Sequence, residues 1–490
     1  MGILKKLASQ TAIYGLSSIF GRFLNYLLVP LYTYYFSAAE YGVVSEFYAY
    51  AGFFSVLLLL GFETGYFRFR DAAQTGKDVA YSTALIFVVV VNVLFFAAVV
   101  LVNSRLSAAL HYADHPEYVL SFTLILTLDA VAAIAFAKLR AENRAWRFAG
   151  IKVAEIIITV LLSLFFIVYC PKLYARYPES EFARFYRPEI GIGYVFIANV
   201  LASGFKFLLL IPQLKGLAWG FDRVLFVRML RYSLPMVVIG FAGVINEMLD
   251  RALLKYLLPA DAASNLRQLG IYSACYKLSI LMSLFIQAFR YAAEPFFFAY
   301  ADKADARPVY AKVLTFFVVF CVFIFLLVSL FLDFFQYFVG DAFREGLVVV
   351  PILLLANLCL GLYVNLSIWY KLSDHTLLGA FVSTAGAGLT IALNVWWIPV
   401  YGYVGSAWAT LACYASMAVV SYLLGRYFYP VAYDVKRVLA YISLGLALYA
   451  ARQVLPIQAF WQPWLLSAEL LSLYVLVAVL FERRQLLRVR

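Results

Sequence analysis

Charged side chains inside long apolar segments are the residues of this sequence that could do chemistry. A charge near the middle of a membrane-spanning helix costs about 2.5 to 3.5 kcal/mol, so several of them indicate a hydrated or paired interior. The cationic ones are Arg22, Arg251, Lys277 and Arg290. Arginine offers a phosphate or carboxylate a bidentate fork and lysine a mobile point charge. We interpret these four residues as candidate ligands for an anion.

Some of the charged residues in the apolar segments also have a simpler interpretation. Arg290 and Glu294 are four residues apart and could pair on one helix face. Asp250 is a further candidate for the cavity, but its neighbour Arg251 points in another direction along the helix, and the carboxylate could simply hold a nearby cation.

Acidic residues in or near the apolar segments could couple a conformational change to an ion gradient, because a carboxylate in a cavity can bind a proton or sodium. The candidates for such coupling are Glu46, Glu63, Asp129 and Glu155. Structural pairing is the alternative for each of them. Glu155 follows Lys152 by three residues, and Glu63 could pair with Arg68.

The composition requires these charges to be positioned by membrane helices. Of 490 residues, 65% are hydrophobic and 13% are charged, whereas soluble domains have about 45 to 50% apolar and about 25% charged residues. The sequence therefore predicts an all-α integral membrane protein with about 14 transmembrane helices and no large soluble domain. The expected spans are 11–36, 43–67, 79–102, 117–137, 150–170, 190–212, 232–257, 270–297, 311–335, 347–370, 376–398, 403–425, 436–455 and 463–481.

The placement of basic residues predicts the topology. Lys and Arg gather in the even-numbered loops and in the tail, which by the positive-inside rule puts both termini in the cytoplasm. Examples of these clusters are Lys138, Arg140, Arg144 and Arg147, and Arg483, Arg484, Arg488 and Arg490. Because such clusters lie beside anionic lipid, the net charge of +12 needs no nucleic-acid partner.

A weak internal repeat divides the chain. A shift of 228 residues aligns Gly42, Val43, Ser45 and Tyr48 with Gly270, Ile271, Ser273 and Tyr276. Two six-helix lobes in parallel topology can rock around a central site, which favours transport by alternating access. We expect an N-terminal lobe at 1–218, a C-terminal lobe at 219–430 and two additional transmembrane helices at 431–490. Chance similarity between apolar segments is the alternative.

Ordered motifs carry a resemblance over most of the chain. They are Gly21 and Arg22; Pro30, Leu31, Tyr32 and Thr33; Glu40, Tyr41 and Gly42; Gly61, Phe62, Glu63, Thr64 and Arg68; Leu234 and Pro235; Asp250 and Arg251; Gly270, Ile271, Tyr272, Ser273 and Lys277; and Asn394, Pro399, Tyr401, Gly402, Gly405, Ala407, Ala409 and Thr410. In this order and spacing, the sequence resembles the polysaccharide transporter branch (Wzx-like O-antigen and oligosaccharide flippases) of the MOP (MATE-like) flippase superfamily.

The resemblance implies a MATE-like fold with a hydrated central cavity. It implies a flippase, not an enzyme, that moves polyprenyl-diphosphate-linked oligosaccharide from the inner to the outer leaflet of the bacterial cytoplasmic (inner) membrane for cell-surface polysaccharide biosynthesis. By analogy, a polysaccharide polymerase and glycosyltransferases would be its partners. The glycan, the pathway and the coupling ion stay open.

Two other functions remain as alternatives. A drug or organic-cation antiporter of the same superfamily would need an acidic cavity, which the excess of cations argues against. A membrane polysaccharide polymerase or ligase would need a larger external loop than the one at about 171–189.

We expect no cofactor and no metal, since the sequence has no P-loop for ATP, and His111 and His115 lack a third ligand.

Overall fold

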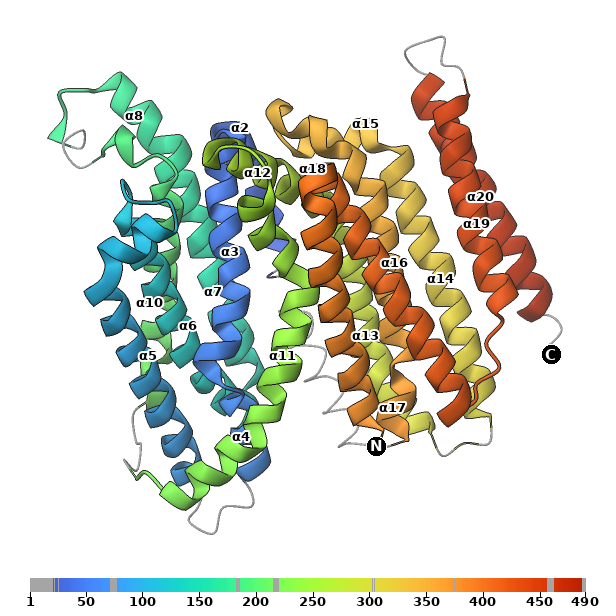
Figure 1. Ribbon diagram of the computed structural model, residues 1–490, viewed down its shortest axis with the longest axis horizontal. Coiled ribbons are helices and arrows are strands. Elements are labelled where there is room, and N and C mark those ends of the chain that lie inside the picture. The colour runs from blue at the N-terminus through green and yellow to red at the C-terminus, as the bar shows by residue number, and fades with distance from the viewer. Residues whose placement is uncertain are drawn as a thin grey trace. The chain divides into compact units, whose positions relative to one another are not determined.

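The computed structural model describes residues 21, 23–24, 26–70, 77–181, 186–214, 220–301, 303, 305–373, 375–455 and 462–486. Every regular element in these ranges is a helix (Figure 1), which confirms the predicted all-α fold. The chain forms two compact units. Unit 1 comprises the residues up to Lys255 together with Ala260–Leu269, and unit 2 comprises Tyr256–Pro259 and the residues from Gly270 onward.

Unit 1 contains the helices of the first half of the chain. They are α2 (Leu28–Tyr35), α3 (Ala38–Leu59), α4 (Phe62–Phe69), α5 (Lys77–Ala109), α6 (Pro116–Ala141), α7 (Ala145–Leu164), a π-helix (Phe165–Tyr169), α8 (Cys170–Arg176), a 3-10 turn (Pro188–Ile190), α10 (Gly193–Leu214), nearly all of α11 (Arg223–Leu257) and the start of α12 (Ala262–Leu278). Helix α6 packs against α3, α5, α7 and α10 and is the centre of this bundle.

Helix α3 begins at a capping box and packs closely against α12. The Ser37 hydroxyl accepts from the Glu40 N–H at 3.3 Å, and the Ser37 N–H donates to the Glu40 carboxylate at 2.8 Å, which satisfies two end groups of the backbone. One turn later, a Cβ on Gly42 would lie 2.0 Å from the Leu266 carbonyl oxygen. Only glycine allows this approach, so the motif Glu40, Tyr41, Gly42 sets both where the helix begins and what it packs on.

The second predicted span is broken between α3 and α4. Leu60 and Gly61 both have positive φ, at 45° and 69°. Backbone carbonyls released at such a break need new donors in a membrane. The Asn92 side chain donates to the Leu58 carbonyl at 3.2 Å, and the Ser233 hydroxyl donates to the Gly61 carbonyl at 3.1 Å. The break is therefore a satisfied part of the fold.

Unit 2 contains the remaining helices. They are the end of α12, α13 (Ile280–Tyr300), α14 (Ala306–Leu330), α15 (Leu332–Phe335), 3-10 turns at Gln336–Phe338 and Asp341–Val348, α16 (Val349–Leu366), α17 (Ile368–Leu372), α18 (Thr376–Phe428), α19 (Val435–Val454) and α20 (Gln462–Leu486). Helix α14 packs on α13, α16, α19 and α20, so the last two helices dock along it.

Helix α18 is a hairpin of two antiparallel helices that fold at Gly402. The Cys413 thiol lies 3.3 Å from the Gly386 carbonyl, and the Ser406 hydroxyl donates to the Asn394 side chain at 2.9 Å. Both pairs are centred at about residue 400, close to Gly402, whose φ of 60° and ψ of −145° are not helical. Such a backbone conformation is essentially restricted to glycine. The predicted spans 376–398 and 403–425 are thus the two arms of this hairpin.

The predicted count of fourteen spans is not confirmed. Within the described ranges, 10 helices are long and apolar enough to cross a membrane, or up to 11 if the bent pair α12 and α13 is one span. Three features account for the difference. The two arms of the hairpin α18 are counted as one helix. Helix α19 carries Arg437 and Arg452 and is less apolar, and most of the predicted first span, 11–36, lies outside the described residues.

The two units differ in extent from the predicted lobes. Helix α11, which the sequence division at 218 and 219 assigned to the second lobe, belongs to unit 1 through Lys255. Packing units do not by themselves define a repeat, so the division into lobes at 1–218 and 219–430 with 431–490 appended stays a prediction.

Candidate functional site

Two of the proposed cavity residues lie together near the end of α11. Asp250 is buried, and Arg251 is half-buried with its backbone N–H donating to the Asp250 carboxylate at 2.8 Å. This contact fixes the carboxylate beside the backbone of its neighbour. Arg22 lies outside the described residues.

Lys277 lies at the break between α12 and α13 in unit 2. The two helices are bent by 50° relative to each other, and Ser279 occupies the junction. Its hydroxyl donates to the Tyr276 carbonyl at 2.7 Å and accepts from the Asn357 side chain of α16 at 3.1 Å. Broken helices are where membrane transporters place binding sites, because the bend directs polar groups into a cavity. The half-buried Lys277 is two residues from this junction.

Arg290 belongs to a charged cluster with Glu294 and Lys371. The Arg290 Nε atom lies 3.9 Å from a Glu294 oxygen, and the Lys371 ammonium donates to the other Glu294 oxygen at 2.6 Å. The predicted i,i+4 pairing of Arg290 with Glu294 is therefore confirmed, and Lys371 of α17 adds a second cation.

Glu46 forms a closed ion pair with Lys255. Both side chains are almost inaccessible, at 0% and 1% exposure. The Lys255 ammonium donates to both Glu46 oxygens at 2.9 and 2.8 Å and to the Leu110 carbonyl at 2.7 Å. The hydroxyls of Tyr50 and Tyr112 each donate to the carboxylate at 2.5 Å. All three ammonium donors are used. This arrangement indicates a structural role for the ion pair, which connects α3, α11 and the end of α5.

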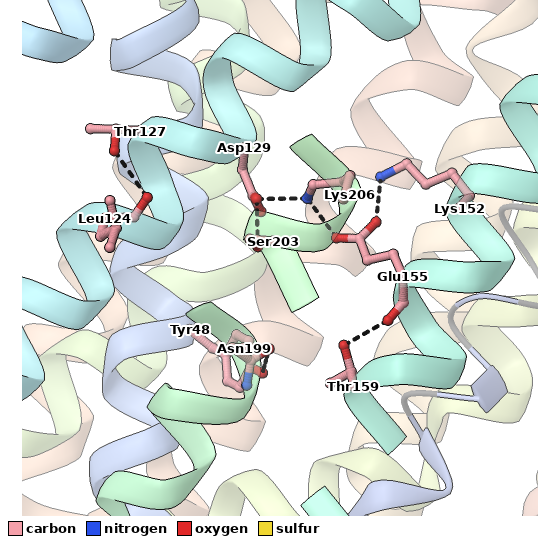
Figure 2. A network of polar contacts seen from close by, with 10 residues as sticks. All are labelled: Tyr48, Leu124, Thr127, Asp129, Lys152, Glu155, Thr159, Asn199, Ser203 and Lys206. Carbon is pink, nitrogen blue, oxygen red and sulfur yellow. Dashed lines mark hydrogen bonds and ion pairs between the residues drawn. The ribbon is translucent and has the colours of Figure 1, made fainter. Parts of the chain in front are cut away.

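A second network places Lys206 of α10 between two carboxylates (Figure 2). Its ammonium lies 2.6 Å from Asp129 of α6 and 2.5 Å from Glu155 of α7. The Ser203 hydroxyl also donates to Asp129, at 2.8 Å, and Lys152 contacts Glu155 at 3.5 Å. This last contact confirms the pairing expected from the spacing of Lys152 and Glu155.

The two carboxylates of this network differ in access. Lys206 is 2% exposed, whereas the Asp129 side chain is 45% exposed and Glu155 lies between these values. Asp129 therefore has the most exposed side chain of the four predicted coupling residues.

Lys206 and Lys255 are not among the predicted site residues, although each forms the centre of a polar network. A signal for Lys206 was present. Asn199, Ser203 and Lys206 follow each other at four and three residues in an otherwise apolar helix, which places them on one face. In Figure 2 this face carries the Tyr48–Asn199 contact of 3.5 Å as well as the Asp129 contacts.

Glu63 lies at the start of α4 and pairs with Arg140 of α6, not with Arg68 as expected. The Arg140 guanidinium also lies 5.0 Å from the centre of the Phe67 ring. In addition, Arg70 donates to the Ala141 carbonyl. Glu63 and Arg140 are both half-buried. Their ion pair therefore connects the start of α4 with the end of α6.

No group of three or more metal-binding side chains occurs in the described ranges. The His115 Nδ1 atom lies 2.9 Å from the Glu117 carboxylate, and its ring stacks on Tyr118 with a centroid distance of 4.7 Å. This histidine is thus engaged in local contacts at the start of α6.

Solved structures of membrane transporters share this fold. The lipid II flippase MurJ in an inward closed conformation matches with a TM-score of 0.72 at 16% identity, over 96% of this chain and 99% of that one. An inward-facing multidrug resistance MATE family transporter of the MOP superfamily matches with a TM-score of 0.64 at 12% identity, over 85% of this chain and 94% of that one. A MATE in complex with MaD3S matches with a TM-score of 0.60 at 13% identity, over 86% of this chain and 95% of that one.

The chain is therefore a multi-pass integral membrane protein with the MurJ and MATE type of transporter fold. A sequence profile described as polysaccharide biosynthesis protein matches residues 7–301, more than half of the chain, so this protein belongs to the polysaccharide biosynthesis protein family. A search of curated protein sequences finds no match.

Proposed function

We propose that this protein is a flippase that moves polyprenyl-diphosphate-linked oligosaccharide from the inner to the outer leaflet of the bacterial cytoplasmic membrane. The flipped substrate would supply cell-surface polysaccharide biosynthesis, with a polymerase and glycosyltransferases as partners. Both termini would lie in the cytoplasm, as the positive-inside rule predicts. The protein would act as a transporter and not as an enzyme.

The observation that carries this proposal is the joint match to family and fold. The family is one of polysaccharide biosynthesis, and the flippase fold covers 96% of this chain. A membrane protein in this biosynthesis that has a transporter fold would move a lipid-linked intermediate. The fold alone does not define the cargo, so the proposed substrate is supported by the family and by the charges.

We propose Arg251 and Lys277 as the main ligands of the diphosphate, with Arg22, Arg290 and Asp250 in the same cationic cavity. The half-buried positions of Arg251 and Lys277 and the helix break beside Lys277 support this assignment. An alternating-access cycle would expose these cations to one leaflet and then to the other. Arginine and lysine would replace part of the hydration that the diphosphate loses.

Coupling to an ion gradient is proposed at the Asp129 network. A proton or a sodium ion at the exposed Asp129 would weaken its contact with Lys206 and change how α6 and α10 are held together. Glu155 would retain the ammonium meanwhile, because it lies 2.5 Å away. Glu46 and Glu63 remain candidates, although their pairing with Lys255 and Arg140 favours structural roles.

The test is leaflet-resolved flipping of a polyprenyl-diphosphate oligosaccharide by the full-length protein in proteoliposomes. Arg251→Ala and Lys277→Ala should each lower the flipping rate at least about tenfold, because each removes a charge-assisted contact of about 1.5 to 3 kcal/mol. Arg228→Ala is the matched control for α11, and Lys303→Ala is the control for unit 2, because both remove exposed cations.

Loss of flipping in the two site variants but not in the controls would support the cationic cavity. Equal losses in all four variants would refute the assignment of the ligands. If the intact protein flips no lipid-linked glycan but exports an organic cation against a proton gradient, the antiporter alternative replaces the proposal.

A further inference from the structure

An open cavity with charged side chains at its rim lies in unit 2, away from the candidate site described above. Its volume is about 360 Å³, and it lies between the first turns of α14, the segment that precedes α19 and the first turn of α19. Three cations and one acid line it, namely Arg307, Lys312, Arg437 and Asp434. The cavity thus collects an excess of positive charge at one end of the helices.

Two of the three cations are available for a ligand. Arg437 already pairs with Glu482 at 2.5 Å, and its backbone N–H donates to Asp434 at 3.1 Å. The exposed Arg307 stacks over the Tyr429 ring at 5.0 Å, which leaves its N–H groups accessible. Lys312 is exposed and makes no hydrogen bond or ion pair within the described part of the chain. Arg307 and Lys312 would therefore hold the anion.

The surface next to the cavity indicates a lipid rather than a soluble anion. Phe316 and Phe320 follow Lys312 by four and eight residues, so they lie on the same face of α14, about 6 and 12 Å further along the helix. Their side chains are 44% and 48% exposed. A lipid whose headgroup occupies the cavity would therefore find apolar surface in the direction of the membrane.

We propose that this cavity binds the phosphate headgroup of an anionic phospholipid. The loops that form it, between the predicted spans 270–297 and 311–335 and between 403–425 and 436–455, are ones that the basic-residue pattern predicts to be cytoplasmic. Anionic lipids of the inner leaflet attract cations at that surface. The bound lipid would join α14 to α19, which pack against each other. This proposal does not depend on the identity of the transported substrate.

The test is lipid binding to the full-length protein, measured by native mass spectrometry from mixed micelles. The probes are phosphatidylglycerol and phosphatidylcholine with identical acyl chains. The variant is Arg307→Gln combined with Lys312→Gln. The matched control is Lys436→Gln, which removes an exposed cation from the first turn of α19 that does not line the cavity.

The intact protein should prefer phosphatidylglycerol, and the double variant should lose affinity about fivefold for each neutralised cation. The control should keep the affinity of the intact protein. If the intact protein binds phosphatidylglycerol and phosphatidylcholine equally well, the proposal is overturned. This comparison needs no variant. An equal loss in the control also overturns it. Displacement of the lipid by millimolar inorganic phosphate would mean a soluble-anion site instead.

Discussion

Removing Lys255 should strongly destabilise unit 1, because its partner Glu46 is inaccessible. In Lys255→Met the carboxylate would keep the hydroxyls of Tyr50 and Tyr112 but lose the Lys255 ammonium. Breaking a buried ion pair in this way costs about 3 to 5 kcal/mol. The two tyrosine hydroxyls lower the cost, so we expect about 3 kcal/mol.

The double variant Glu46→Gln with Lys255→Met separates pairing from packing. Without the negative charge, the buried position no longer needs an ammonium, so the double variant should be more stable than Lys255→Met alone. A coupling energy of about 1 to 3 kcal/mol is expected for residues in direct contact. Lys255→Met removes the donor of the Leu110 carbonyl whether residue 46 is Glu or Gln. The cost of that loss therefore cancels in the double-mutant cycle.

The assay is the free energy of unfolding in mixed micelles, titrated with sodium dodecyl sulfate. The matched control is Arg228→Met, which removes an exposed cation from the same helix and should change stability by less than about 0.5 kcal/mol. Two results would refute the stabilising role of the Glu46–Lys255 ion pair. One is a loss of unfolding free energy below about 1 kcal/mol for Lys255→Met. The other is a loss in the double variant that exceeds the sum of the losses in the two single variants.

Three further predictions concern other parts of the fold. Lys206→Met should lower the unfolding free energy by about 3 kcal/mol, whereas Lys152→Met, which removes a partly exposed cation, should cost less than about 1 kcal/mol; the same titration measures both. Gly402→Ala should cost about 1 to 3 kcal/mol, and an unchanged unfolding midpoint would contradict the hairpin. Hydrogen bonds from Ser264 lower the pKa of Asp261 below its ordinary 3.8, so its contribution should be present above about pH 4 and lost as the pH falls through the lowered pKa. The stability difference between the intact protein and Asp261→Asn should therefore shrink with acidification.

The sequence predicted the all-α class because apolar composition and length define membrane helices almost directly. It predicted two spans separated at 399–402 for a similar reason, since Pro399 and Gly402 interrupt an apolar run, and the structure has its turn at Gly402. It did not predict that α11 packs into unit 1, because assignment to a unit depends on which faces meet. The contact of Gly42 with Leu266, more than two hundred residues away, has no local signal.

Ion pairs between different helices could not be predicted from the sequence either. The pairing of Lys152 with Glu155 follows from their spacing, and the structure confirms it. The partners of Glu46, Glu63 and Asp129 lie on other helices, so neighbours in sequence could not identify them. For Glu63 the local candidate, Arg68, was on the same short helix, but the side chain turns to α6.

The pairing of these acids bears on the kind of substrate. A transporter of organic cations needs a carboxylate that faces its cavity without a resident cation. Glu46, Glu63, Asp129 and Glu155 each contact a lysine or arginine, so none of them offers an uncompensated negative charge. Glu247 differs, since its side chain is exposed on α11 and forms no ion pair within the described ranges. A cation exporter that binds its substrate at Glu247 would lose activity in Glu247→Gln, whereas a flippase for an anionic lipid would keep it. The contrast between Glu247→Gln and Arg251→Ala, two changes one helical turn apart, therefore tests the two transport classes on a single helix.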